Sequence, residues 1–231
     1  MNRIKPILFN TDMVCAVLDN RKTVTRRTVK PTQIIGLGCD RCPNNLPEEY
    51  IKEKKKKMLF KPWCDMADNE LIGSIYKAPY EPGDILYVRE TYSPNYFDES
   101  LADYRGDGLR GNRHAYKADY RRDIVGDSVP EPKWKPCIHM PKEAACIWLK
   151  VTAVRAERLQ DITGADAVKE GEIPVIHMNG EPDEAATRTA FISTWNDTVT
   201  DADMEQYGWD ANPYVWVIEF ERCEKPDGCD G

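Results

Sequence analysis

The sequence has no long hydrophobic run and no excess of positive charge, and each absence excludes a class of protein. No stretch reaches the ~18 consecutive apolar residues of a transmembrane helix, and residues 1–10 lack the apolar core of a signal peptide. The 32 lysines and arginines are outnumbered by 39 aspartates and glutamates, which gives a net charge of -7. We therefore expect a cytoplasmic protein that has no membrane partner and does not coat DNA through bulk charge.

Internal repeats are also missing, whereas the residues that build a hydrophobic core are present. The 231 residues include 6 Trp, 11 Tyr and 5 Phe, which excludes a wholly disordered chain. A chain of this length is enough for one domain or two small ones. We predict a single domain over 1–231, with an insertion at 31–78, where hydrophobic periodicity is lost, and a loose tail at 223–231.

Short strands and short helices alternate irregularly along the chain, which favours an α+β fold over a doubly wound sheet. Thr11, Thr163 and Asp183 suit helix N-caps, and Asn20 and Gly171 suit the left-handed conformation that ends a helix. The patterning predicts strands at 4–9, 23–27, 85–90, 114–118, 146–159 and 214–222, and helices at 12–19, 163–171 and 183–198.

The densest cluster of chemically active residues is the segment 20–27, NRKTVTRR. Four cations and two hydroxyl groups follow directly on a predicted helix end. One interpretation is a solvated edge strand, because basic residues protect the exposed edge of a sheet. The other is a pocket for a small anion or nucleotide, in which arginine forks bind a planar ligand and the lysine serves as a tunable amine.

Five short motifs in a fixed order resemble the ASCH-domain family, in its longer, phage-associated form. The motifs are ILF, RKTVTRR, PGDILYVRET, ERLQDIT before a helix that ends in EG, and YVWVIEF, and the resemblance covers about 1–30, 79–92, 114–119 and 133–222. It implies a PUA-like fold, a small mixed β-barrel with flanking short helices and the loop-rich segment 31–78 inserted. It also implies a modified pyrimidine nucleoside or a short RNA as the partner.

Some bacterial members of this family are amidohydrolases that remove the acetyl group of N(4)-acetylcytidine. By motif position, the resemblance implies that Lys22 is the proton acceptor, Thr25 the nucleophile and Glu170 the proton donor. A lysine that works near neutral pH must have its pKa lowered by about three from ~10.4, which burial and nearby cations favour. Glu170 must then hold its own proton. Lys22 and Thr25 can share a pocket only if Lys22 lies in the turn before the strand.

Further residues of the motifs are candidate substrate contacts. They are Arg21 and Arg26 of the first basic segment, and Arg89 and Glu90 at the end of the strand predicted at 85–90. The resemblance implies that this strand end faces the pocket, whereas an exposed cross-strand salt bridge is the alternative. Two other functions stay open: a non-catalytic module that binds RNA or a modified base, and a ribonuclease, which needs a cationic groove continuous with the pocket.

The eight cysteines are read as thiols rather than disulfides, because we expect a reducing compartment. Cys39, Cys42 and Cys64 form half of a zinc-site pattern, but a second CxxC or HxxxH is missing. We predict no cofactor and no catalytic metal. A structural zinc at these three cysteines, organising the insertion, is the alternative.

Overall fold

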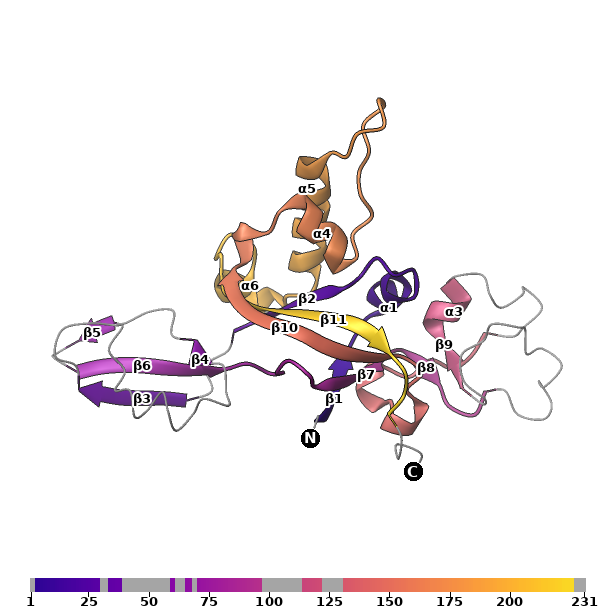
Figure 1. Ribbon diagram of the computed structural model, residues 1–231, viewed down its shortest axis with the longest axis horizontal. Helices are drawn as coiled ribbons and strands as arrows, with labels where there is room; N and C mark the ends of the chain where they lie inside the picture. Colours follow the sequence, from indigo (N-terminus) through magenta and orange to yellow (C-terminus); the bar gives the residue numbers. More distant parts are fainter. Residues whose placement is uncertain are drawn as a thin grey trace.

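The core of the protein is a mixed sheet of five strands in the order β1–β7–β10–β11–β2 (Figure 1). The computed structural model describes residues 3–29, 78–96, 114–121 and 131–226, and the backbone of short strands within 33–77. β1 and β7 are parallel, and the other neighbours in the sheet are antiparallel. The strands of this sheet are β1 (Ile4–Leu8), β2 (Val24–Thr28), β7 (Ile85–Arg89), β10 (Trp148–Arg158) and β11 (Tyr214–Cys223).

The long antiparallel pair of β10 and β11 spans the whole sheet as a curved ribbon (Figure 1). β10 contacts β7 through its first residues, Trp148 to Lys150, and β11 contacts β2 through residues 215–219. The register between β10 and β11 shifts between Val151 and Ala153. Such a bulge bends a strand and increases its twist, so this pair can curve between the two ends of the sheet.

The other elements are short and lie around this sheet. Four strands within 31–78 form a separate sheet in the order β3–β6–β4, with β5 on β6. These elements are α1 (Thr11–Leu18), β3 (Gln33–Gly38), β4 (Leu59–Phe60), β5 (Asp65–Ala67), β6 (Glu70–Lys77), β8 (Tyr92–Ser93), β9 (Ala115–Tyr116), α3 (Lys117–Arg121), η2 (Cys137–His139), η3 (Lys142–Ala144), η4 (Leu159–Asp161), α4 (Gly164–Glu170), α5 (Glu184–Asp197), η5 (Asp201–Asp203) and α6 (Met204–Tyr207).

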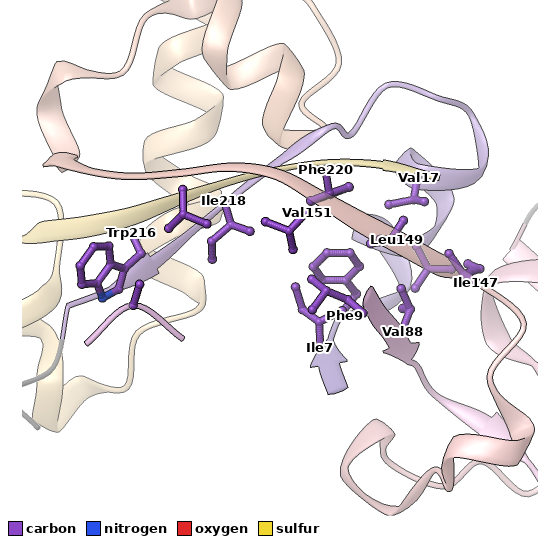
Figure 2. Close-up of a cluster of buried hydrophobic side chains, with 14 of the residues drawn as sticks. Ile7, Phe9, Val17, Val88, Ile147, Leu149, Val151, Trp216, Ile218 and Phe220 are labelled. Carbon is purple, nitrogen blue, oxygen red and sulfur yellow. The ribbon is translucent and has the colours of Figure 1, made fainter. Parts of the chain in front are cut away.

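Two hydrophobic clusters cover the two faces of β11, as its alternating sequence requires. Trp216, Ile218 and Phe220 face the larger cluster, which also contains Ile7, Phe9 and Leu149 (Figure 2). Val215 and Val217 face the opposite way, into a cluster with Phe191 and Trp195 of α5. Helices therefore lie on both sides of β11, with α1 in the first cluster and α4 and α5 in the second.

The helix boundaries follow local sequence signals, with one correction. The predicted capping box is present, since Thr163 Oγ1 accepts from Asp166 N at 3.1 Å, and Gly171 ends α4 with φ 110°. Asn20 has φ 57°, as predicted for the residue after α1. The prediction of Thr11 as the N-cap of α1 is wrong, because Asn10 Oδ1 accepts from Met13 N at 2.8 Å and Thr11 is already helical.

The predicted α+β class is confirmed, and one predicted strand needs correction. Only 115–116 of the strand expected at 114–118 are extended, because Lys117–Arg121 is helical. Residues 137–139 and 142–144 form 3-10 turns. In the described part of the chain, β1 and β2 are the two ends of the strand path and no pairing between them closes a barrel. Side chains bridge this gap: Arg27 Nη2 donates to Leu8 O at 2.7 Å.

Candidate functional site

The turn between α1 and β2 lies against the C-terminal end of α4. The main-chain N–H groups of Arg21 and Lys22 both donate to Ala16 O, at 2.9 and 3.0 Å, which fixes the turn on α1. Because the last carbonyls of a helix lack partners within it and carry partial negative charge, cations and N–H donors stabilise this end. Three consecutive residues of the turn donate hydrogen bonds to three consecutive carbonyls at this helix end. Thr23 N donates to Lys169 O (2.9 Å), Lys22 Nζ to Glu170 O (2.6 Å), and the Arg21 guanidinium to Gly171 O.

Four charged side chains form a continuous chain of ion pairs beside this helix end. Glu170 divides its carboxylate between two cations, with Oε2 at 2.8 Å from Lys22 Nζ and Oε1 at 3.1 Å from Arg26 Nη1. Arg26 Nη2 reaches Glu157 Oε1 of β10 at 2.6 Å. The side chains of Lys22 and Arg26 are 0% and 1% exposed. Each buried charge therefore has an opposite charge within hydrogen-bond distance, which offsets the cost of removing it from water.

Burial lowers the pKa of the Lys22 ammonium below its ordinary value. The charge and the hydrogen bond of Glu170 act in the opposite direction, and the charges of Arg27 and Arg26 add to the lowering. The net direction is downward, because removing an ammonium from water outweighs a single carboxylate neighbour here. Lys22 is thus closer to the neutral amine form than an exposed lysine.

A cavity of about 370 Å³ lies next to this ion-pair chain. Thr25 lines it from the middle of β2 and is 1% exposed. Its volume falls within the range of about 300–1,000 Å³ that is usual for small-molecule sites. Its walls combine charged side chains with the aromatic rings of α5, and the main lining residues are Asp12, Met13, Arg21, Thr25, Arg26, Arg27, Arg121, Glu170, Glu172, Phe191 and Trp195.

The structure brings most of the predicted site residues to this cavity. Arg21, Thr25, Arg26 and Glu170 line it. Lys22 lies in the turn before β2, as sharing a pocket with Thr25 requires, but its ammonium bonds to Glu170 and it is not among the lining residues. Among the contacts of the described residues, there is no hydrogen bond between Lys22 Nζ and Thr25 Oγ1.

Arg89 and Glu90 lie at the end of β7 and are not among the described residues that line the cavity. The Arg89 guanidinium donates to Ile138 O. Glu90 is 1% exposed, and its main-chain N–H lies 3.2 Å from Met140 Sδ. This strand end is therefore covered by the segment 137–140.

Three residues at the site were not among the predicted site residues. Glu157 comes late in the long strand β10, and nothing in the local sequence links it to Arg26, because β11 lies between their strands. Phe191 and Trp195 are four residues apart in the helix expected at 183–198, and their ring centroids are 6.1 Å apart. That spacing indicates a buried face, and the cavity uses the same face as its wall.

In the described ranges, no group of three or more His, Cys, Asp or Glu residues could hold a metal ion. Cys39, Cys42 and Cys64 lie outside the described residues. In the same ranges, the helices are all too short or too polar to cross a membrane.

No protein-family model, curated protein or solved structure matches the chain. The resemblance to ASCH domains therefore rests on the five sequence motifs alone.

Proposed function

We propose that this protein is an ASCH-domain protein with a PUA-like barrel, and that it hydrolyses the N(4)-acetyl amide of acetylcytidine in the cavity beside α4. The observation that carries the proposal is that Thr25 and Glu170 line one cavity and Lys22 bonds to Glu170 beside it, although residue 170 is far from the other two in the sequence. The rings of Phe191 and Trp195 give the cavity the apolar wall that a flat base requires.

The PUA-like barrel is supported by the arrangement of the edge strands. β1 and β2 end the strand path, and the Arg27 side chain of β2 reaches a β1 carbonyl at 2.7 Å. Tyr80 OH also donates to Pro6 O of β1 at 2.7 Å. The sheet is curved and its two edge strands are linked by side chains, so main-chain pairing between β1 and β2 is what closure into a barrel would add.

In the proposed reaction, Thr25 Oγ attacks the acetyl carbonyl carbon and Lys22 takes the hydroxyl proton. Glu170 gives its proton to N4 as the C–N bond breaks, so that cytidine leaves with a neutral amine and the acetyl group stays on Thr25. Water then attacks this ester; one of its protons returns to the threonine oxygen, and the other leaves with acetic acid, which ionises to acetate in solution. Lys22 and Glu170 are then an ion pair again. To accept the threonine proton, the neutral Lys22 amine must move from Glu170 O toward Thr25.

The ion pair of Lys22 and Glu170 accounts for how a base and an acid coexist. Moving one proton across the 2.8 Å contact from Nζ to Oε2 converts the ion pair into a neutral amine and a carboxylic acid. This transfer makes both catalytic forms at once and leaves the net charge of the pair unchanged. The lowered pKa of Lys22 favours it, whereas Arg26, which contacts the same carboxylate, opposes it.

A non-catalytic binding module is the second candidate, and one observation favours it. Lys22 is 0% exposed and its ammonium is held by both the carboxylate and the carbonyl of Glu170. Under this alternative, these two contacts of Lys22 serve to hold the end of α4 against the turn before β2. Under this alternative the cavity binds a modified base or a short RNA, and Lys22 stays protonated.

The experiment that tests the reaction follows loss of the acetyl group from N(4)-acetylcytidine by absorbance and chromatography. We expect the purified protein to release cytidine and acetate. Thr25→Ala removes turnover, because no hydroxyl group remains to attack, whereas Thr25→Ser keeps part of it. Glu170→Gln lowers the rate by about 10²–10⁴, the usual contribution of a general acid.

Thr23→Ala is the matched control, because Thr23 is exposed and contributes its main chain to the site. It should leave turnover at the wild-type level. Absence of turnover in a folded wild-type protein that still binds acetylcytidine would favour the binding module. Turnover that survives Thr25→Ala would contradict the assignment of the nucleophile.

A further inference from the structure

The positive charges that line the cavity are unequally compensated. Four arginines line it, and three of them pair with carboxylates. The pairs are Arg21 with Asp19 (3.3 Å), Arg26 with Glu157 (2.6 Å) and Glu170 (3.1 Å), and Arg121 with Asp12 (2.6 Å). Arg27 differs: within the described part of the chain it has no carboxylate partner, and its one hydrogen bond runs from Nη2 to Leu8 O at 2.7 Å.

The surroundings of Arg27 suit the binding of an anion. Its guanidinium lies 5.8 Å from the centre of the Phe9 ring, which supports the plane of the group without using its N–H donors. Among the contacts of the described residues, only one of its five N–H donors is used, and a planar guanidinium matches the oxygen spacing of a phosphate. Burial lowers the pKa of this arginine, and an anion bound beside it would offset that cost.

Glu172 provides the complementary feature in the same cavity. It lines the wall and has no cationic partner among the residues that the structure describes. A carboxylate repels phosphate but accepts hydrogen bonds from hydroxyl and amino groups. Among the described residues, the cavity thus offers one positive and one negative side chain without an ion-pair partner, which suits a ligand that carries both an anionic group and neutral donors.

We propose that the cavity takes a nucleoside 5′-monophosphate, with its phosphate on Arg27 and its hydroxyl or amino donors on Glu172. This inference rests on the proposed function and narrows its substrate class from nucleosides to nucleotides. A cavity of about 370 Å³ has room for a single nucleotide. The net charge of -7 disfavours a long RNA, because polynucleotide binding depends on many lysine and arginine contacts to phosphates.

Calorimetric titration of the full chain with cytidine, cytidine 5′-monophosphate and inorganic phosphate tests this assignment. We expect the monophosphate to bind about tenfold tighter than cytidine, since hydrogen bonds to charged groups contribute at this level. Arg27→Gln should remove this preference and leave the affinity for cytidine unchanged, and Arg27→Lys should keep part of it. Arg222→Gln removes the same charge from an exposed position on β11 and should keep the full preference.

The possible outcomes separate this inference from the proposed function. Equal affinities for cytidine and its monophosphate would overturn the inference while leaving the nucleoside site intact. An equal loss of both affinities in a folded Arg27→Gln protein would show that Arg27 supports the cavity rather than a phosphate, and would also overturn it. If a short oligoribonucleotide, titrated in the same way, binds and the monophosphate does not, RNA is the favoured ligand and the inference is also overturned. If no cytidine derivative binds, the proposed function itself fails.

Discussion

The end of α4 and the end of β7 each bring together an arginine and a glutamate, but they hold these charges in different ways. At α4, Glu170 contacts Lys22 and Arg26, and Arg26 contacts Glu157, at 2.6–3.1 Å. At β7, Arg89 donates to the carbonyl of Ile138 and the N–H of Glu90 meets a methionine sulfur. The first region borders a cavity, whereas segment 137–140 covers the second.

This difference shows that similar sequence motifs can end in different environments. The basic segment 20–27 follows a helix and the pair Arg89–Glu90 ends a strand, but both supplied candidate substrate contacts in the sequence. What separates them is the segment that packs on each one: a helix end whose last carbonyls accept hydrogen bonds in one case, and a 3-10 turn in the other. Contacts between distant segments decide which motif borders a cavity.

The largest effect should come from removing the shared carboxylate of the α4 region. Glu170→Ala leaves Lys22 buried without a carboxylate partner, and breaking such a pair costs about 3–5 kcal/mol of unfolding free energy. The matched change in the β7 region, Arg89→Met, removes hydrogen bonding to one carbonyl and should cost about 0.5–1.5 kcal/mol. Urea unfolding measures both values. Equal losses would remove the distinction between the two regions.

A smaller effect should follow from changing the residue that ends α4. A Cβ added at Gly171, where φ is +110°, would lie 2.9 Å from Ala16 Cβ and 3.4 Å from Lys22 Cβ. Gly171→Ala should therefore cost about 1–3 kcal/mol, typical of a strained backbone position. Gly180→Ala is the control, because φ there is +86° but nothing lies within 4 Å of the added atom. If thermal unfolding shows the same loss of stability in both variants, the close packing of α4 on the turn contributes nothing to stability.

The smallest expected effect is a change of stability with pH that belongs to the α4 region alone. Because burial lowers the pKa of Lys22, the unfolded chain binds more protons than the folded chain between the folded pKa and the ordinary value of 10.5. The stability linked to Lys22 is therefore complete above that value and decreases as the pH falls through the lowered pKa. The difference in stability between wild type and Lys22→Met should grow as the pH rises from neutral toward 10.

Arg89 provides the control for this measurement, because an arginine stays charged over the whole range. The difference between wild type and Arg89→Met should stay constant with pH. Urea unfolding at several pH values measures both differences. A constant difference for Lys22→Met would mean that Glu170 holds the ammonium charged throughout.

The sequence predicted local structure well where the signal and its effect lie close together. Thr163 and Asp166 are three residues apart, so their capping box could be recognised without the fold. The neighbouring residues Asn10 and Thr11 are both suitable caps, and only the backbone shows that Asn10 reaches Met13 N. Such ambiguities shift an element by one residue and leave the architecture unchanged.

The candidate site was predictable only in part, since its geometry depends on distant contacts. Asn20 indicated that Lys22 precedes the strand, and that placement is found. The pairing of Arg26 with Glu157 could not be inferred, because it depends on β11 lying between β2 and β10. The position of Arg89 under Ile138 likewise depends on how a segment 49 residues further along the chain folds back.

The polar groups along β1 have a consequence for how molecules of this protein meet one another. An edge strand with free N–H and C=O groups recruits strands from other molecules and starts aggregation. Pro6 lies within β1 and has no N–H to offer, its carbonyl accepts from Tyr80 OH, and the carbonyl of Leu8 accepts from Arg27. The outer side of β1 is thereby protected against pairing with strands of other molecules. Even at high protein concentration, aggregation should therefore not start at this edge.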